Sequence, residues 1–223
     1  MASEQGVPEW VYVFVDPGNS MAVMNLQITG QYTSSVLAAM SDPDFAAAYV
    51  EGRADFLPFV PNPSVSTGFM SPFVVGTING YRVEYDAELA RRAYFKGAPS
   101  RLTGIYAFES MDGCRAVNAR YGPSWPLDTV QRFKTENVLR ATRVNMEIVS
   151  LARYAYGRAM LDAQSIEHLW RAYWSGEDDY TMDLPTVDAK GREVRSAGTT
   201  WEWIIDGSLL HESRVSGSKP GSA

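Results

Sequence analysis

The chain has 223 residues, of which 45% are hydrophobic and 21% are charged, and its 26 acidic and 20 basic side chains leave a formal net charge of −6. This composition excludes a largely disordered chain, and the acidic balance does not favour electrostatic capture of nucleic acid, although a local basic strip over residues 91–101 could still supply it. One cysteine and two histidines exclude an intramolecular disulfide, a thiolate-rich metal site and multi-histidine metal sites.

The first elements are predicted directly after the N-terminus. Residues 10–15 (WVYVFV) are β-branched and aromatic, which is typical of a buried strand, and Asp16-Pro17-Gly18-Asn19 predicts a tight turn. Residues 34–52 are alanine-rich and divide into two short helices, the second beginning at Pro43. The prolines in residues 56–72 indicate irregular chain.

The middle of the chain predicts a hairpin, a helix, a strand and a second helix. Residues 74–83 form the predicted hairpin, because Asn79-Gly80 suits a two-residue turn. Residues 86–95 have an Asp cap and an apolar face, and residues 102–108 (LTGIYAF) resemble a central strand. Ser110 is expected to cap the helix that runs toward Tyr121 and Gly122.

The C-terminal third alternates helix and strand signals. Residues 138–144 predict a strand, and residues 146–174 predict two helices separated near Asp162. The polar residues 177–199, with a turn at Lys190-Gly191, predict an exposed loop or hairpin. Two terminal strands are expected at residues 201–205 and 209–215, separated by Asp206-Gly207-Ser208.

Together these elements predict one α+β domain over residues 1–216 and a flexible tail over residues 217–223. The N-terminus lacks a basic start followed by an apolar run, and no stretch approaches the ~20 apolar residues that cross a bilayer. We therefore expect a cytoplasmic protein that contacts no membrane and holds no metal.

Three segments, read in order, resemble a family of uncharacterised bacterial and phage proteins of the ADP-ribosyltransferase-like fold. They are residues 99–109 (PSRLTGIYAFE), residues 172–177 (AYWSGE) and residues 201–205 (WEWII). The middle segment is the most specific, since adjacent Tyr and Trp before Gly-Glu are rare by composition. The resemblance implies a mixed or antiparallel split β-sheet core with flanking helices.

The resemblance also implies an activity, the transfer of ADP-ribose from NAD to a macromolecular acceptor. This reaction breaks the ribose–nicotinamide bond through an oxocarbenium-like state, so a carboxylate at the ribose is indispensable. In this fold the carboxylate lies on a late strand, which corresponds to Glu202. Alternation along residues 201–206 places Glu202, Ile204 and Asp206 on one face of the strand. The alternative is that Glu202 is an ordinary solvent-facing strand residue.

Candidate cofactor-binding residues follow from the same segments. Arg101 is expected to bind the pyrophosphate of NAD, and Ser100 or Thr103 the nicotinamide-side ribose. Tyr106 would stack on the nicotinamide, and Tyr173 would close a wall of the cleft. Each has a plainer alternative: a surface arginine, a core tyrosine and an aromatic packing anchor.

The first strand departs from the wider superfamily, in which many members carry a Tyr-His or an Arg there. Residues 10–14 contain no histidine, and Tyr12 is the polar-tipped candidate that remains. Two other sets of side chains are expected to be structural. Met21 and Met24 are predicted core residues, and Glu109 is predicted to interact with the N-terminus of the helix that follows it.

Three functions remain open at this point. The first is an NAD-dependent ADP-ribosyltransferase that modifies protein or nucleic acid as a bacterial or phage effector. The second is a catalytically inactive binding module of the same fold. The third is a small-molecule hydrolase with Glu109 and Glu202 as an acid/base pair, which requires the two carboxyl groups to lie within about 10 Å.

Overall fold

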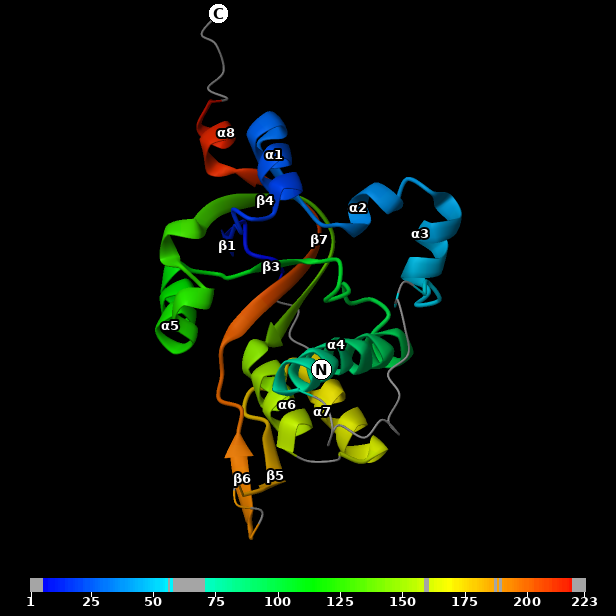
Figure 1. The fold of residues 1–223 in the computed structure, drawn as a ribbon. Coiled ribbons are helices and arrows are strands. Elements are labelled where there is room, and N and C mark those ends of the chain that lie inside the picture. Colours follow the sequence, from blue (N-terminus) through cyan, green and yellow to red (C-terminus); the bar gives the residue numbers. More distant parts are fainter. Residues whose placement is uncertain are drawn as a thin grey trace, which may run out of the picture. The chain divides into compact units, whose positions relative to one another are not determined.

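The computed structural model describes residues 6–55, 57, 71–158, 161–186, 188 and 190–217. It has an α+β fold with antiparallel sheets, which confirms the predicted fold class at this level (Figure 1). Its contacts group the chain into two compact units where the sequence predicts one domain. Unit 1 comprises residues 1–43, 103–143 and 200–223, and unit 2 comprises residues 44–102 and 144–199.

Unit 1 contains an antiparallel sheet in the order β1-β4-β7-β2, with β3 paired to β7. The strands are β1 (Trp10–Phe14), β2 (Gln31–Thr33), β3 (Ile105–Ala107), β4 (Val130–Asn145) and β7 (Trp201–His211). Phe108, directly after β3, also bridges to Tyr12 on β1. Strand β1 also pairs with β4, β4 with β7, and β7 with β3. The pairings among β1, β4, β7 and β3 therefore form a closed circuit.

One face of these strands carries the hydrophobic core of unit 1. Its buried members are Val11, Val13, Val15, Ile105, Ala107, Phe133, Trp203, Ile205 and Leu209. Side chains alternate along a strand, so the residues of β7 adjacent to these core members project to the opposite face. The residues of β7 on that opposite face include Glu202, Ile204, Asp206 and Ser208.

Four helices accompany the described strands of unit 1. They are α1 (Ser20–Thr29), α2 (Val36–Ala39), α5 (Met111–Tyr121) and α8 (Glu212–Gly217). The helix predicted after Ser110 is confirmed, since the Ser110 hydroxyl accepts a hydrogen bond from the backbone N–H of Gly113 at 3.1 Å. Helix α1 and strand β2 have no counterpart among the predicted elements.

Unit 2 combines a helical cluster with a hairpin. Its helices are α3 (Pro43–Val50), α4 (Pro72–Tyr94), α6 (Met146–Arg158) and α7 (Ala163–Ser175), and α4, α6 and α7 pack against one another. The two predicted helices around Asp162 are confirmed, because its carboxylate caps α7 through the N–H of Ser165 at 2.7 Å. The polar segment that follows is the hairpin of β5 (Thr181–Pro185) and β6 (Arg192–Ser196).

The predicted hairpin at residues 74–83 is wrong, because these residues lie inside α4. The helix begins with Pro72 and is capped by the Ser71 hydroxyl, and it continues without interruption into the helix predicted at residues 86–95, ending at Tyr94. Packing of α4 against α6 and α7 overrides the weak helix propensity of Asn79 and Gly80.

The predicted turn at residues 206–208 is also wrong. Strand β7 runs through these residues, and Gly207 has a φ of 152°. A Cβ at this position would lie 2.1 Å from the carbonyl oxygen of Asn137, so the glycine permits β7 and β4 to approach closely. The second terminal strand ends at His211, and residues 212–217 form α8 rather than strand.

Two expectations fall largely outside the described residues. Most of the predicted irregular stretch at residues 56–72 is not described, nor are residues 218–223 of the predicted tail. The remaining tail residue, Gly217, belongs to α8.

Candidate functional site

One face of the unit 1 sheet brings together three of the predicted site residues: Tyr12, Tyr106 and Glu202. Tyr106 on β3 is paired with Ile204 on β7, and continuing that register by one residue places Phe108 opposite Glu202. Phe108 also exchanges two backbone hydrogen bonds of 2.8 Å with Tyr12. Directly paired residues project to the same face, and neighbouring strands lie ~4.8 Å apart, so Tyr12 and Glu202 project from backbone positions within about 10 Å.

This face of β7 carries buried carboxylates. Glu202 is 3% exposed and Asp206 is 1% exposed. Arg140 on β4 forms an ion pair with Asp206 at 3.0 Å, which offsets part of the cost of burying that charge. The burial of Glu202 contradicts the interpretation of an ordinary solvent-facing strand residue.

A cavity of about 790 Å³ lies in unit 1 next to the start of β3. Thr103 and Tyr106, two of the predicted cofactor-binding residues, line it. Its other walls include α1, β2 and the end of β1, and of these only β1 is connected to a site by the sequence. Tyr106 therefore belongs both to this cavity and to the face that carries Glu202.

The chemistry of the cavity lining is aromatic and neutral. Phe14, Tyr32, Tyr106 and Trp125 supply rings, and the Phe14 and Trp125 rings meet edge to face at a centroid distance of 5.1 Å. Hydroxyl and amide groups complete the lining: those of Asn19, Asn25, Thr29, Thr33, Ser34, Ser35 and Thr103. The residues that line the cavity include no lysine, arginine, histidine or carboxylate. Such a lining suits stacking and hydrogen bonding to an aromatic, polyhydroxylated group.

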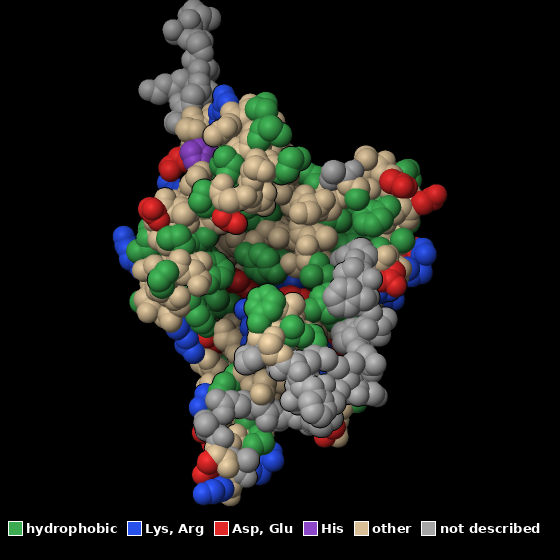
Figure 2. Space-filling model, in the orientation of Figure 1, with side chains coloured by type: hydrophobic (Ala, Val, Ile, Leu, Met, Phe, Trp, Pro, Cys, Tyr) green, Lys and Arg blue, Asp and Glu red, His purple; other side chains and the backbone are tan. Residues whose placement is uncertain are grey.

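Helix α1 presents apolar side chains to this cavity and to solvent. Met21, Met24 and Ile28 line the cavity, and Met21 and Ile28 are 71% and 70% exposed. Figure 2 shows hydrophobic side chains gathered over α1. The prediction that Met21 and Met24 are core residues is therefore wrong. Their sequence spacing does not distinguish a core face from the wall of a cavity.

The remaining predicted cofactor-binding residues, Ser100, Arg101 and Tyr173, lie in unit 2. The guanidinium of Arg101 binds both carboxylate oxygens of Glu84, at 2.8 and 3.2 Å, and donates to the Tyr173 hydroxyl. This bidentate contact is typical of a structural ion pair. Tyr173 itself is fully buried.

The Glu84 carboxylate also contacts Arg153 at 3.3 Å. Burial alone raises the pKa of Glu84, but the charges and hydrogen bonds of Arg101 and Arg153 together outweigh it, so the pKa is lowered. The carboxylate consequently stays ionised at neutral pH.

Ser100 takes part in a second buried network of unit 2. Its hydroxyl donates to Glu88 at 2.8 Å, and its N–H donates to the Tyr49 hydroxyl at 3.0 Å. Glu88 in turn binds Arg91 at 2.7 Å, with both side chains almost fully buried. Because each polar group in this network has a hydrogen-bond partner, it fixes the path of the chain before Arg101.

Glu109 has two partners that the sequence does not predict. Its carboxylate accepts hydrogen bonds from Trp203 Nε1 at 2.9 Å and from Arg143 at 2.8 Å. Trp203 and Glu202 are consecutive on β7 and project to opposite faces. Glu109 is therefore held on the side of the sheet opposite to Glu202, which is unfavourable for an acid/base pair of these two carboxylates.

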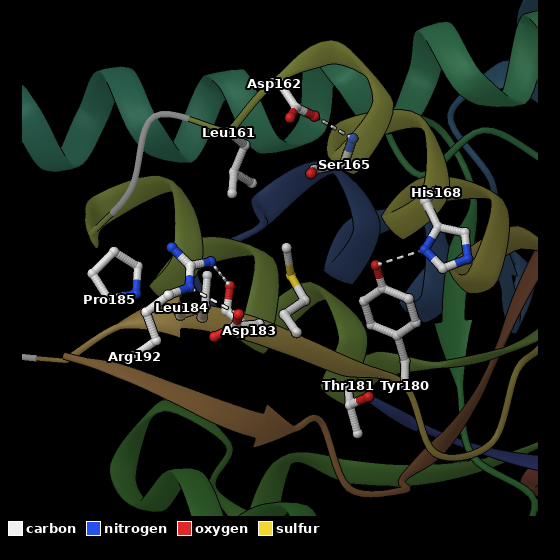
Figure 3. Close-up of a pocket in the computed structure, with 11 residues that line it drawn as sticks. Leu161, Asp162, Ser165, His168, Tyr180, Thr181, Asp183, Leu184, Pro185 and Arg192 are labelled. Atoms are coloured by element: carbon white, nitrogen blue, oxygen red, sulfur yellow. Dashed lines mark hydrogen bonds and ion pairs between the residues drawn. The ribbon is translucent and has the colours of Figure 1, made fainter.

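Unit 2 has a cavity of its own, of about 610 Å³, between the start of α7 and the β5–β6 hairpin (Figure 3). Its polar groups interact in pairs. Asp183 binds Arg192 at 2.8 Å, and the Tyr180 hydroxyl lies 3.4 Å from His168 Nδ1. Burial, with a smaller contribution from Glu177, raises the pKa of Tyr180 to about 12. None of the predicted site residues lines this cavity.

No protein-family model matches this chain, and no curated protein is significantly similar to it. Among the residues that the structure describes, no three histidine, cysteine or acidic side chains are grouped so as to hold a metal ion. None of the described helices has the length and apolar character needed to span a bilayer.

Proposed function

We propose that the protein is an NAD-dependent ADP-ribosyltransferase of the ADP-ribosyltransferase-like fold, with Glu202 as the catalytic carboxylate. The observation that carries the proposal is the strand register. It projects Tyr12, Tyr106 and Glu202 from one face of the unit 1 sheet, and Tyr106 is shared with the 790 Å³ cavity. Three residues chosen from separate sequence segments are thereby neighbours in space.

The lining of the cavity supports binding of the nicotinamide riboside portion of NAD. The nicotinamide ring of NAD carries a positive charge, and aromatic faces attract cations. Tyr106 and Trp125 offer such faces, and the hydroxyls of Thr33 and Thr103 can hydrogen-bond the ribose. A cavity without lysine or arginine avoids repulsion of the cationic ring.

Glu202 would act at the ribose. Its carboxylate, buried and therefore weakly screened, stabilises the positive charge that develops on the sugar as the nicotinamide bond breaks. In the same position it can orient the acceptor nucleophile. The proposal does not use Arg101, Ser100 or Tyr173, whose contacts within unit 2 give them a structural role.

The acceptor in this proposal is a macromolecule, protein or nucleic acid, and the protein acts as a bacterial or phage effector. The proposal assigns the lining residues of the cavity to the donor, NAD, and therefore names the acceptor only as a class of molecule.

The experiment is a nicotinamide-release assay with purified protein, NAD and cell extract. The wild-type protein should release nicotinamide, and Glu202→Gln should release it at least about a hundredfold more slowly, the usual effect of removing one preorganised electrostatic group. Glu109→Gln is the matched control, since this carboxylate lies on the other side of the same sheet, and it should retain activity.

Two results would contradict the proposal. Equal trace release by the wild type and Glu202→Gln would exclude an enzymatic role for Glu202. Saturable NAD binding without cleavage would instead establish the inactive binding module as the function.

A further inference from the structure

A third cavity, of about 490 Å³, lies on the other side of α1 in unit 1. Helices α1 and α8 lie side by side there (Figure 1), and the end of β7 leads into the cavity through His211. Apolar side chains of Val15, Val23 and Leu26 form one part of its lining. The other part is polar and is formed by Gln27, Gln131, His211, Ser213 and Arg214.

Arg214 provides the charge of this cavity. Its side chain lies across Gly30, where a Cβ would be 2.4 Å from Arg214 Cγ and 2.8 Å from Nε. Gly30 has a φ of 73° at the end of α1, so a glycine here both permits the left-handed backbone and leaves room for the arginine. The neighbouring Glu212 is bound to Arg132 at 2.7 Å, and no described carboxylate forms an ion pair with Arg214.

His211 is held in a defined orientation beside the arginine. Its backbone N–H donates to the carbonyl of Gly30 at 2.8 Å, and its ring packs edge to face on Phe133 at 5.4 Å. Nδ1 lies 2.8 Å from the Ser213 hydroxyl and 3.3 Å from the Ser213 backbone N–H, which donates to it. Because Nδ1 accepts a hydrogen bond, the proton of the neutral ring is on Nε2, which makes Nε2 a donor.

The polar part of the cavity thus offers hydrogen-bond donors beside one positive charge. The Arg214 guanidinium, the His211 ring and the side-chain amides of Gln27 and Gln131 contribute, and no carboxylate lines the cavity. An apolar wall beside a cationic donor group matches a molecule with a hydrocarbon or aromatic body and an anionic head.

We propose that this cavity binds a small amphipathic anion, a carboxylate or phosphate monoester, with its head on Arg214 and His211 and its body on Val15, Val23 and Leu26. The site is separate from the proposed NAD cavity, and its existence does not depend on ADP-ribosyltransferase activity. Arg214 supplies the bidentate donor, and Gly30 leaves room for its side chain.

The test is isothermal titration of the intact protein with octanoate, octyl phosphate and octanol. Octanoate and octyl phosphate should bind saturably at one site, and octanol at least about tenfold more weakly, because it lacks the charge that Arg214 recognises. Arg214→Gln should weaken octanoate binding at least about tenfold, whereas Arg214→Lys should weaken it less, because it keeps the charge and loses the bidentate geometry.

Arg115→Gln is the matched control, since Arg115 is an exposed arginine of α5 in the same unit and does not line the cavity. It should bind octanoate as the wild type does. The proposal fails if Arg214→Gln binds octanoate unchanged, if octanol binds as tightly as octanoate, or if neither anion saturates at millimolar concentration.

Discussion

Replacement of Gly207 by alanine tests the close approach of β7 and β4 in unit 1. Gly207 has a φ of 152°, a region that costs a non-glycine residue about 1 to 3 kcal/mol. The added Cβ would also lie 2.1 Å from the Asn137 carbonyl oxygen and 3.0 Å from Val138 Cα. Both contacts are with backbone, so relief requires strand movement, at a typical overpacking cost of about 1 to 3 kcal/mol.

Together these costs predict that Gly207→Ala lowers the free energy of unfolding by about 2 to 6 kcal/mol, a large part of the ~5 to 15 kcal/mol of a typical domain. Urea unfolding followed by circular dichroism measures the loss. The matched control is Gly80→Ala in α4, where the new Cβ meets no atom within 4 Å apart from the nearby backbone of the helix itself.

Alanine is the better helix former, so Gly80→Ala should raise stability by about 0.5 to 1 kcal/mol. A loss below about 1 kcal/mol for Gly207→Ala would refute the close approach of β7 to β4. A destabilised Gly80→Ala would instead favour the Asn79-Gly80 turn over the helix.

Three further predictions concern single side chains. Burial raises the pKa of the Cys114 thiol from 9.0 to about 12, which leaves very little thiolate at pH 8. Ellman's reagent should therefore react on the order of a thousandfold more slowly with native than with urea-unfolded protein. Glu84→Gln should cost about 1.5 to 3 kcal/mol at neutral pH by removing the charged partner of two arginines. The pKa of Glu84 is lowered in the folded protein. The difference in free energy of unfolding between the wild type and Glu84→Gln should therefore be complete above pH 4.5 and disappear as the pH falls through the pKa of the folded state. Unfolding measured over a range of acidic pH tests this, and a difference that stays constant with pH would contradict it. Asn145→Ala should lower the free energy of unfolding by at least about 2 kcal/mol, because the side-chain amide donates hydrogen bonds to two carbonyls, at 2.7 and 2.8 Å. Thermal unfolding measures the loss. A loss under about 0.5 kcal/mol would show that water replaces the amide.

Local signals predicted the elements that local chemistry stabilises. The Ser110 and Asp162 caps, Pro43 at the start of α3 and the apolar first strand were all found from the sequence, because each depends on residues close together in the chain. The α+β class follows from the same signals.

The errors arose where tertiary contacts decide the structure. Helix α1 has no buried residue and separates two cavities, so it shows no apolar stripe that could identify it. Gly80 and Gly207 both carried turn signals, yet one lies in a packed helix and the other at a close strand approach. The grouping of distant segments into two units likewise has no local signature.

The candidate site was predictable in part. The sequence predicts Glu202, Tyr12, Tyr106 and Thr103 as site residues, and all four lie in unit 1. The walls of the cavity come from α1 and β2, whose residues join Tyr106 only through folding. The partner of Arg101, Glu84, is 17 residues away and has no motif that would mark it as an ion-pair partner.

Glu202 is the residue on which the proposed chemistry depends, and mass spectrometry of cells that express the protein tests it most directly. Cells with the wild-type chain should accumulate ADP-ribosylated protein or nucleic acid, and cells with Glu202→Gln at equal expression should not. Identical spectra from the two, with or without adducts, would contradict ADP-ribosyl transfer by this carboxylate.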